Sequence, residues 1–449
     1  MKRLLFQWFV LAGFVILAKA QEPPAKNPAV AKILSEISES NIRATVERLV
    51  SFGTRHTLSD TLSDMRGIGA ARRWIKSEME RYAGASGGGM TVEFHESVVP
   101  QSLRVPRPTK IANVIATLRP TAQSSSSRIF IAGGHYDSRA SNGGDATSDA
   151  PGANDDGSGT AVTMELARVF ARYKFDATVV FIAFVGEEQG LLGATQWAEM
   201  ARSKGWNVEA VLNNDIVGSS ISGDGRKEDG FVRVFSEAFS SVDTGGVFRM
   251  RNSLGLENDG ASRSLARYVK EIGERYVPGF GIKMVYRKDR FLRGGDHSPF
   301  HDRGVAAVRF SVAVENYDWQ HQDVRTENGN EYGDLPKFMD FAYCVNVARV
   351  NAAVLATLAL APASPERAGI VTSQLEYQTT LRWQANREPD LAGYLVRYRP
   401  TTSAEWDHAF FSKDTTVTLD LLKDDYLFGV QAVDKEGNVS LPAIPRAVR

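Results

Sequence analysis

The sequence predicts an α/β protein with a mixed, mostly parallel β-sheet flanked by helices, followed by a small all-β sandwich. Two patterns lead to this fold class. Between residues 28 and 360, apolar runs of strand length alternate with segments of helical periodicity, which is typical of an α/β domain. After residue 365, short alternating segments rich in aromatic residues are separated by turn residues, as in a β-sandwich. The chain of 449 residues is long enough for both parts.

The first twenty residues have the layout of a secretory signal peptide. Two basic residues precede the run Leu4–Leu17, which is apolar apart from Gln7, and Ala18-Lys19-Ala20 forms a small-x-small cleavage site. The alternative, a transmembrane anchor, is disfavoured because the run is shorter than the roughly 20 residues that span a bilayer. We therefore expect cleavage near Gln21 and a secreted or periplasmic location. No later segment is expected to be apolar enough to span a bilayer, so we expect no membrane anchor after signal cleavage.

The first part of the mature chain alternates between predicted helices and strands. Helices are expected at residues 28–50, 64–82, 161–173, 191–201 and 336–360. Ser40-Asn41 is interpreted as a break or cap in the first helix, and Asp64 as the cap of the second. Strands are expected at residues 128–132, 177–185, 208–212 and 305–312. The run 177–185, ATVVFIAFV, is almost continuously apolar, which indicates a parallel strand covered on both faces.

A Pro-containing linker at 361–365 separates the second part of the chain. Its strands are expected at residues 379–383, 393–398, 415–419 and 426–433. The positions of Trp383, Gly393-Tyr394 and Tyr426 resemble those of a fibronectin type III module. We therefore expect a main domain at 21–360 and a β-sandwich at 366–449 that contributes no catalytic residue and could contact a surface or a large substrate.

The composition excludes several classes of function. Lys and Arg total 53 and so do Asp and Glu, giving zero formal charge, so we expect no nucleic-acid partner. Cys344 is the single cysteine of the sequence. An intrachain disulfide and a cysteine-based metal cluster are therefore both impossible.

Acidic and histidine side chains follow three of the predicted strands. His135 and Asp137 follow the strand at 128–132, Glu187 and Glu188 follow 177–185, and Asp215 follows 208–212. Because ligands of open α/β sheets bind beyond the carboxyl ends of the strands, these side chains are expected to converge on one cleft.

A fourth segment, the Gly-rich loop 151–159, adds Asp155 and Asp156 where a helix begins. Each residue has an ordinary explanation by itself: an aspartate here could cap the helix, the glutamates could be a solvated strand end, and His135 a core histidine. Together, however, nitrogen and oxygen donors without thiolates suit zinc or a similar divalent ion. Adjacent glutamates allow one to bind metal while the other moves the proton of a metal-activated water.

These segments resemble the exported zinc aminopeptidase family that includes bacterial leucyl aminopeptidases, aminopeptidase Y, glutamate carboxypeptidase and the non-catalytic transferrin receptors. The resemblance runs from about Leu49 to Leu360, and implies the zinc-exopeptidase (phosphorylase/hydrolase-like) fold. Its motifs are GGHYDS (133–138), PGANDDGSG (151–159), GEEQGLLG (186–193), NND (213–215) and HQDVRTEN (321–328).

The resemblance implies two zinc ions per chain. It assigns His135, Asp155 and Asp215 to one ion, and Asp155, Glu188 and His321 to the other, so that Asp155 bridges them. It also makes Glu187 the general base, uses Asp137 to orient the first histidine, and implies a cis peptide between Asp155 and Asp156.

The match is looser around the closing histidine. His321 lies in Trp-Gln-His-Gln-Asp rather than the Tyr-His-Thr-Pro of many relatives, so His297 is kept as the second candidate. His56, His95 and His408 lie outside any motif and are expected to be ordinary surface or loop residues. Since no tyrosine matches the family's oxyanion donor, Arg293 or another residue of 286–295 is expected to serve.

The function that this pattern favours is an exported dizinc aminopeptidase, which removes N-terminal residues from a peptide or protein substrate through a zinc-bound water and a glutamate base. A carboxypeptidase or dipeptidase on the same scaffold is the alternative, because residues 226–293 are rich in arginine, although the explanation that these arginines form solvated faces is favoured. A non-catalytic, receptor-like binding protein is disfavoured because every ligand and base position is filled.

Overall fold

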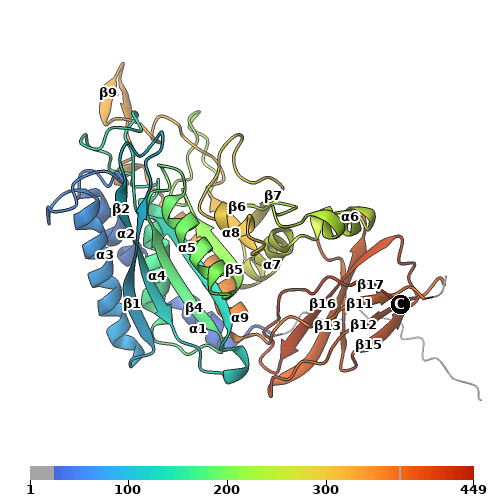
Figure 1. Ribbon diagram of the computed structural model, residues 1–449. Helices are drawn as coiled ribbons and strands as arrows, with labels where there is room; N and C mark the ends of the chain where they lie inside the picture. The colour runs from blue at the N-terminus through green and yellow to red at the C-terminus, as the bar shows by residue number, and fades with distance from the viewer. Residues whose placement is uncertain (1–24, 374–375) are drawn as a thin grey trace, which may run out of the picture.

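The computed structural model describes residues 25–373 and 376–449 (Figure 1). The predicted signal peptide, residues 1–20, lies outside the described residues. The described chain forms one large sheet with helices on both faces, a two-stranded sheet of β9 (Arg325–Glu327) and β10 (Asn330–Tyr332), and two smaller sheets built from its C-terminal strands. The predicted fold class, a mixed α/β sheet followed by an all-β part, is confirmed.

The large sheet has eight strands. In spatial order they are β1 (Met90–Val99), β2 (Thr109–Leu118), β4 (Thr178–Phe184), β3 (Arg128–His135), β5 (Asn207–Asn214), β8 (Ala307–Ser311), β6 (Phe231–Phe235) and β7 (Gly281–Val285). The central strands β4, β3, β5 and β8 pair in parallel, as do β6 and β7, whereas β1–β2, β2–β4 and β6–β8 are antiparallel. The parallel centre matters for function because several strand ends meet at one edge.

The sequence did not indicate β1, β2, β6 and β7. β1 is an edge strand whose side chains are mostly exposed or half-buried, so it lacks the apolar run that marked β4. β6 and β7 have five residues each and carry Arg233 and Lys283 at their centres. Short strands that contain a charge give little periodic signal.

Helices cover both faces of the sheet. They are α1 (Pro28–Ser35), α2 (Glu39–Val50), α3 (Gly67–Ala83), α4 (Gly157–Phe170), α7 (Ala261–Tyr276) and α9 (Phe341–Leu360) on one face, and α5 (Leu192–Ser203) and α8 (Ser298–His301) on the other. Side chains of a strand point alternately to the two faces. Accordingly, Phe130 belongs to the core under the first set of helices, and its neighbour Ile131 to the core under the second.

Two predicted helix caps are wrong. The segment 28–50 forms two helices, and Ser38, not Ser40-Asn41, caps the second by accepting the N–H of Asn41. Asp64 does not cap α3, which begins at Gly67; it forms an exposed ion pair with Arg73 instead. Both errors concern polar residues one to three positions from the true end, where propensity alone cannot choose.

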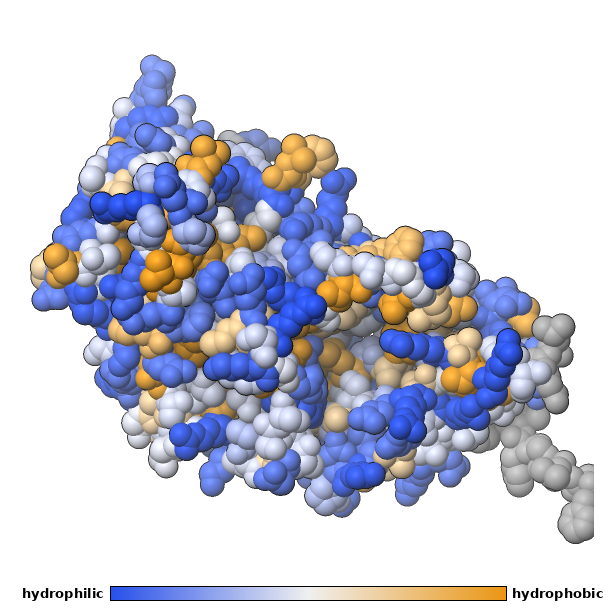
Figure 2. Space-filling view, viewed as in Figure 1, coloured by the Kyte–Doolittle hydropathy of each residue, from blue (hydrophilic) through white to orange (hydrophobic). Residues whose placement is uncertain are grey.

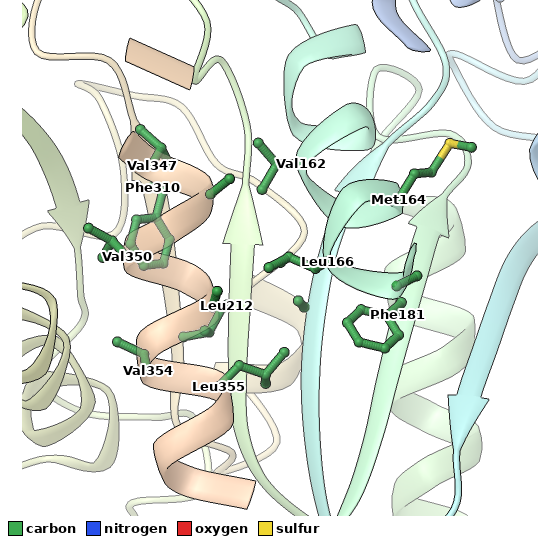
Figure 3. Packing of buried hydrophobic residues seen from close by; sticks show 14 of the residues in the cluster. Val162, Met164, Leu166, Phe181, Leu212, Phe310, Val347, Val350, Val354 and Leu355 are labelled. Atoms are coloured by element: carbon green, nitrogen blue, oxygen red, sulfur yellow. The ribbon is translucent and has the colours of Figure 1, made fainter. Parts of the chain in front are cut away.

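Helix α9 is the centre of the larger core. Figure 3 shows its Val347, Val350, Val354 and Leu355 facing the side chains of α4 and of the strands. By length and composition α9 could cross a membrane, which corrects the expectation that no segment after the signal peptide is so apolar, but 83% of its most apolar window is buried inside the protein. The hydrophobicity of α9 is accounted for by its place between the sheet and the neighbouring helices.

The C-terminal part forms two small sheets. One has the order β15 (Thr416–Leu419), β12 (Thr379–Arg382), β11 (Gly369–Val371) and β17 (Arg446–Val448), and the other β14 (His408–Ser412), β13 (Leu391–Pro400) and β16 (Tyr426–Asp434). Trp383 and Tyr394 meet edge to face in the core between them. β11, β14 and β17 were not expected from the sequence.

These C-terminal strands pack directly on α7 and share a core with the main sheet. Leu395, Val433 and Val439 belong to the same buried cluster as the main-domain helices. The Tyr268 hydroxyl donates to the carbonyl of Val439 at 2.7 Å, and the buried Arg399 donates to both oxygens of Asp259. Residues 361–365 therefore mark a change in the sequence pattern, whereas the hydrophobic core continues across them.

Helix α6 (Gly245–Ser253) lies outside this core. None of its residues is buried, and Val247 and Phe248 are each more than 40% exposed. Figure 2 shows apolar surface, coloured orange, in the region where Figure 1 places α6, beside the C-terminal strands. The helix contributes nothing to the strand ends where the predicted site lies.

The interface between α7 and β13 generates a stability prediction. Asp259→Asn leaves Arg399, which is 1% exposed, without a carboxylate, and breaking a buried pair from one side costs about 3–5 kcal/mol. We expect urea denaturation to show a lower free energy of unfolding by that amount. Asp64→Asn, which removes the exposed pair with Arg73, is the control and should leave the transition nearly unchanged. Equal midpoints for the wild type and Asp259→Asn would contradict a stabilising interface.

Candidate metal centre

The predicted site residues meet at the carboxyl edge of the three central strands. In the parallel register, His135 at the end of β3 lies opposite Phe184 at the end of β4, and Gly133 lies opposite Asn213 of β5. The loops that follow these strands therefore leave the sheet at the same level. They carry the acidic residues that the sequence placed after each strand.

Two groups of three side chains converge at this edge, and each could hold a metal ion. They are His135, Asp155 and Asp215 in one group, and Asp155, Glu188 and His321 in the other, with the donor atoms of each group within 4.8 Å of one another. The Nε2 atom of His135 lies 3.2 Å from Oδ1 of Asp155. The Nε2 atom of His321 lies 2.8 Å from Oδ2 of the same residue. Asp155 thus presents one oxygen to each group.

The orientation of His135 fits a metal ligand. Its Nδ1 atom lies 3.1 Å from the carbonyl oxygen of Asp137, so a proton on Nδ1 is satisfied there. Its Nε2 atom is buried and makes no hydrogen bond to any described residue. This arrangement fixes the tautomer and directs the Nε2 lone pair at the carboxylates, as the partner of a metal-bound histidine does.

The electrostatic field of the site favours a cation. Burial opposes the charge of His321, but the carboxylates of Asp155 and Glu188 outweigh it and raise the pKa of His321 to about 9. Burial, with neighbouring carboxylates, raises the pKa of Glu187 well above its ordinary value. Carboxylates packed this closely need protons or metal ions to balance their charge. The donors present therefore fit one or two divalent ions.

Asp155 and Asp156 have different roles although they are neighbours. The peptide bond between them is cis, as the resemblance implied. Asp156 caps α4 by accepting the N–H of Gly159 at 2.9 Å, and it also accepts the backbone N–H groups of His135 and Ile216. The helix-cap explanation is therefore correct for Asp156, which ties β3, α4 and β5 together, while Asp155 faces the ligand groups.

Asp137 holds the turn after β4. Its two oxygens accept the backbone N–H groups of Gly186, Glu187 and Glu188 at 2.9, 3.3 and 3.2 Å. It also lies 3.5 Å from Nδ1 of His135. The predicted role of orienting the histidine thus has a geometric basis, and Asp137 positions the two glutamates as well.

Glu187 and Glu188 point to different surroundings. Oε1 of Glu188 lies 2.8 Å from Nε2 of His321, inside a ligand group. The half-buried Glu187 carboxylate lines an open pocket, and makes no hydrogen bond or ion pair within the described residues. This difference agrees with one ligand and one free base, the roles that the resemblance assigned.

Three buried residues that support the site were not found in the sequence. Asp334 accepts the backbone N–H groups of Asn154 and Asp155. Arg55 donates to the carbonyl oxygens of Tyr136 and Gly152. Asp334 and Arg55 lie in loops without a periodic pattern and left no signal.

Arg309 is the third of these buried supporting residues, and its position in the sequence did contain a clue to its role. Its guanidinium contacts Asp215 at 2.8 Å and also pairs with Asp289. It is fully buried on β8. A charged residue inside an apolar strand is uncommon without a partner, so Arg309 could have been identified as a site candidate.

The remaining histidines are not brought to the ligand groups. His297, the second candidate for the closing ligand, binds the carbonyl of Lys288 through Nε2, and burial together with Arg309 lowers its pKa to about 3. His56 is a loop residue but not a surface one: it is fully buried and bonded to Gln189. His95 is half-buried on β1, and His408 is exposed.

Comparison with known proteins places the chain in a family. Residues 113–340, about half of the chain, match the model of peptidase family M28. A probable zinc metalloprotease of Leptosphaeria maculans is 45% identical over 411 residues, covering 91% of this chain and 95% of that protein. Another, from Pyrenophora tritici-repentis, is 43% identical over 425 residues, covering 94% and 87%.

Solved structures show the same fold at lower identity. The LapA aminopeptidase of Legionella pneumophila superposes with a TM-score of 0.53 at 20% identity, covering 76% of this chain and 78% of that one. An aminopeptidase from Aneurinibacillus sp. strain AM-1 gives 0.51 at 17% identity, covering 74% and 96%. From the family-model match and the two relatives that align along nearly the whole chain, we conclude that this protein belongs to peptidase family M28.

Proposed function

We propose that this protein is an exported zinc aminopeptidase that uses two zinc ions per chain. The observation that carries the proposal is the position of Asp155, whose two oxygens face the two ligand groups separately. Relatives at 45% and 43% identity are named probable zinc metalloproteases. The nitrogen and oxygen donors here suit that metal.

His135 and Asp215 would hold one ion, Glu188 and His321 the other, and Asp155 both. Zinc, when bound, lowers the pKa of a water molecule and polarises a carbonyl group. Glu187 has a free carboxylate at the same edge. It would take the proton of the attacking water as the oxygen–carbon bond forms, and return it to the amine nitrogen as the carbon–nitrogen bond breaks.

An apolar recess beside Asp155 supports an aminopeptidase. We name it the recess; its apolar lining includes Ile216, Trp319, Phe338 and Met339. The rings of Trp319 and Phe338 stack at 4.2 Å between centroids. The rest of the lining of this partly open recess is polar and includes Asn154, Ser219 and Glu315. The side chain of an N-terminal residue would contact the apolar groups of the recess, and the adjacent carboxylates would offer partners for its free amine.

Several of the arginines that suggested a carboxypeptidase form ion pairs or hydrogen bonds with other residues of the protein. Arg251 pairs with Asp243, Arg267 with Asp259, and Arg263 donates to Asn258. Arg290 and Arg293 do line the pocket next to Glu187.

The proposed activity is tested with purified protein and paired reporter substrates. Zinc-loaded protein should release an amine reporter from leucine, and treatment with a chelator should abolish the release until zinc is restored. A substrate blocked at its N-terminus should not be cleaved. Faster cleavage of N-terminally blocked peptides than of free ones would contradict an aminopeptidase. Export is tested by the intact mass of secreted protein, expected to begin near Gln21.

The two glutamates should give opposite mutant phenotypes. Glu187→Gln preserves size but cannot accept a proton, so we expect normal zinc content and a kcat lower by about 10²–10⁴-fold. Glu188→Gln should lose zinc, with activity partly restored by added zinc. The zinc content and the rate of both variants test this assignment of base and ligand. Loss of zinc from Glu187→Gln alone would show that the roles are reversed.

The shared ligand gives a separate prediction. Asp155→Ala leaves neither group with three protein ligands, so both zinc ions should be lost, as measured by elemental analysis after dialysis. Asp318→Ala, at an exposed position in the loop that precedes His321, is the matched control and should retain both. Retention of one ion by Asp155→Ala would mean that Asp155 does not bridge.

A further inference from the structure

A second pocket opens over the metal centre itself, because its lining includes Glu187 and the ligand residues Asp155, Glu188, Asp215 and His321. Its volume is about 360 Å³, and its basic lining residues are Arg104, Arg139, Arg290 and Arg293. We name it the arginine pocket. The four arginines come from three separate loops of the chain, so the charge is gathered by the fold and not by one basic segment. The sequence singled out only the last two.

Three of these guanidinium groups have no carboxylate of their own outside the metal centre. Arg290 is neutralised by Glu315 at 2.9 Å. By contrast, Arg104 donates to the carbonyl of Glu188. Arg139 donates to the carbonyls that follow it in the chain, and its nearest carboxylate is Glu188 at 3.9 Å.

Arg293 is the most available of the four. Its side chain is exposed at the rim, and within residues 25–373 and 376–449 it has no hydrogen-bond or ion-pair partner. A free guanidinium presents a planar fork of donors that matches the two oxygens of a carboxylate.

The acidic residues of the arginine pocket all belong to the metal centre. They are the ligand residues Asp155, Glu188 and Asp215, together with the free base Glu187. Two zinc ions held by the ligand residues would offset the charge of these four carboxylates, so the charge left at the mouth of the pocket would be that of the arginines. A positively charged cleft concentrates and orients anionic ligands.

The two pockets meet at Asp155, which lines both. For an enzyme that removes one residue, the side chain before the scissile bond needs a bounded recess, and the remainder of the peptide needs a more open path. The recess, whose lining is partly apolar, fits the first requirement, and the wider arginine pocket fits the second. The arginines therefore lie on the side of the leaving amine.

We propose that the arginine pocket binds a carboxylate carried by the residue that follows the scissile bond. The proposal rests on the proposed peptidase activity and adds a substrate class to it. The carboxylate has two possible sources, an acidic side chain at that residue or the C-terminus of a dipeptide. Both present the same planar anion to Arg293 and Arg104.

Two matched pairs of substrates separate the sources. Leu-Glu-amide and Leu-Gln-amide differ only in the side-chain charge, and Leu-Ala and Leu-Ala-amide differ only at the C-terminus. We expect kcat/KM to favour the anionic member of at least one pair by roughly 10- to 100-fold, the range for one charge-assisted hydrogen bond. Equal values within both pairs would overturn the proposal.

Substitutions of the pocket arginines test which residues cause the preference for anionic peptides. Arg293→Gln and Arg104→Gln should each reduce the ratio of kcat/KM for the anionic peptide to that for the neutral one. Arg104→Gln, at a position that is not a candidate oxyanion donor, should leave the neutral peptides within about twofold of wild type. Arg249→Gln is the matched control, since Arg249 is exposed on α6 and outside the pocket. An equal loss for neutral and anionic peptides in Arg293→Gln would overturn the proposal and indicate an oxyanion role instead.

Binding gives a readout that does not depend on turnover. Calorimetry of the same peptides with zinc-loaded Glu187→Gln protein should show tighter binding of the anionic member, weakened by the additional Arg293→Gln change. If no peptide is hydrolysed by the wild type, the proposed function fails, while this measurement still decides the anion preference. If neutral peptides are hydrolysed and no preference appears in rate or binding, the function stands and the arginine proposal fails.

Discussion

The carboxylate of Asp155 is the constraint on which the rest of the site depends. It lies between two histidines, His135 and His321, with one oxygen directed at each. Asp215 and Glu188 complete the two groups, so three carboxylates lie in a largely buried volume. Such a cluster is unstable unless positive charge compensates for it. Arg309 offsets part of the charge at Asp215, and the two histidines or metal ions must offset the remainder.

The surrounding fold holds this cluster through backbone hydrogen bonds. Asp137, Asp156 and Asp334 are buried acids that accept N–H groups from the segments carrying the ligands. Each of these hydrogen bonds fixes a main-chain position. It thereby places the Cα atom from which a nearby ligand side chain extends. Ile216, next to Asp215, and His321 have positive φ angles of 59° and 53°, so the backbone at or beside two ligands departs from the usual regions. Ile216 is buried in the main core, whose packing makes the departure at this position tolerable.

The sequence predicted the parts of the molecule that depend on local pattern. Apolar runs identified the central strands, and the residues that follow them identified His135, Glu187, Glu188 and Asp215. The parallel register then explains why these residues meet. His321 was less certain from sequence because it lies in a loop of mixed polar residues, and only the fold brings its ring to Asp155 and Glu188. Loop residues of this kind are not part of a periodic hydrophobic pattern, so their position in the fold cannot be predicted from one.

Other features depend on contacts between distant segments. Asp334 is 179 positions from the residue whose N–H it accepts, and Arg104 and Arg139 reach one pocket from different loops. The packing of β13 on α7 could not be predicted from the sequence for the same reason. A Pro-containing linker and a change of pattern indicate that a new structural unit begins, but they do not indicate which surfaces of that unit become buried.

The central claim is that one carboxylate bridges two zinc ions. Anomalous diffraction at the zinc edge from crystals of the active protein tests it most directly. The account predicts two peaks roughly 3.5–4 Å apart, both within bonding distance of Asp155, one beside His135 and the other beside His321. A single peak in fully active protein, or two peaks that do not share Asp155, would contradict it.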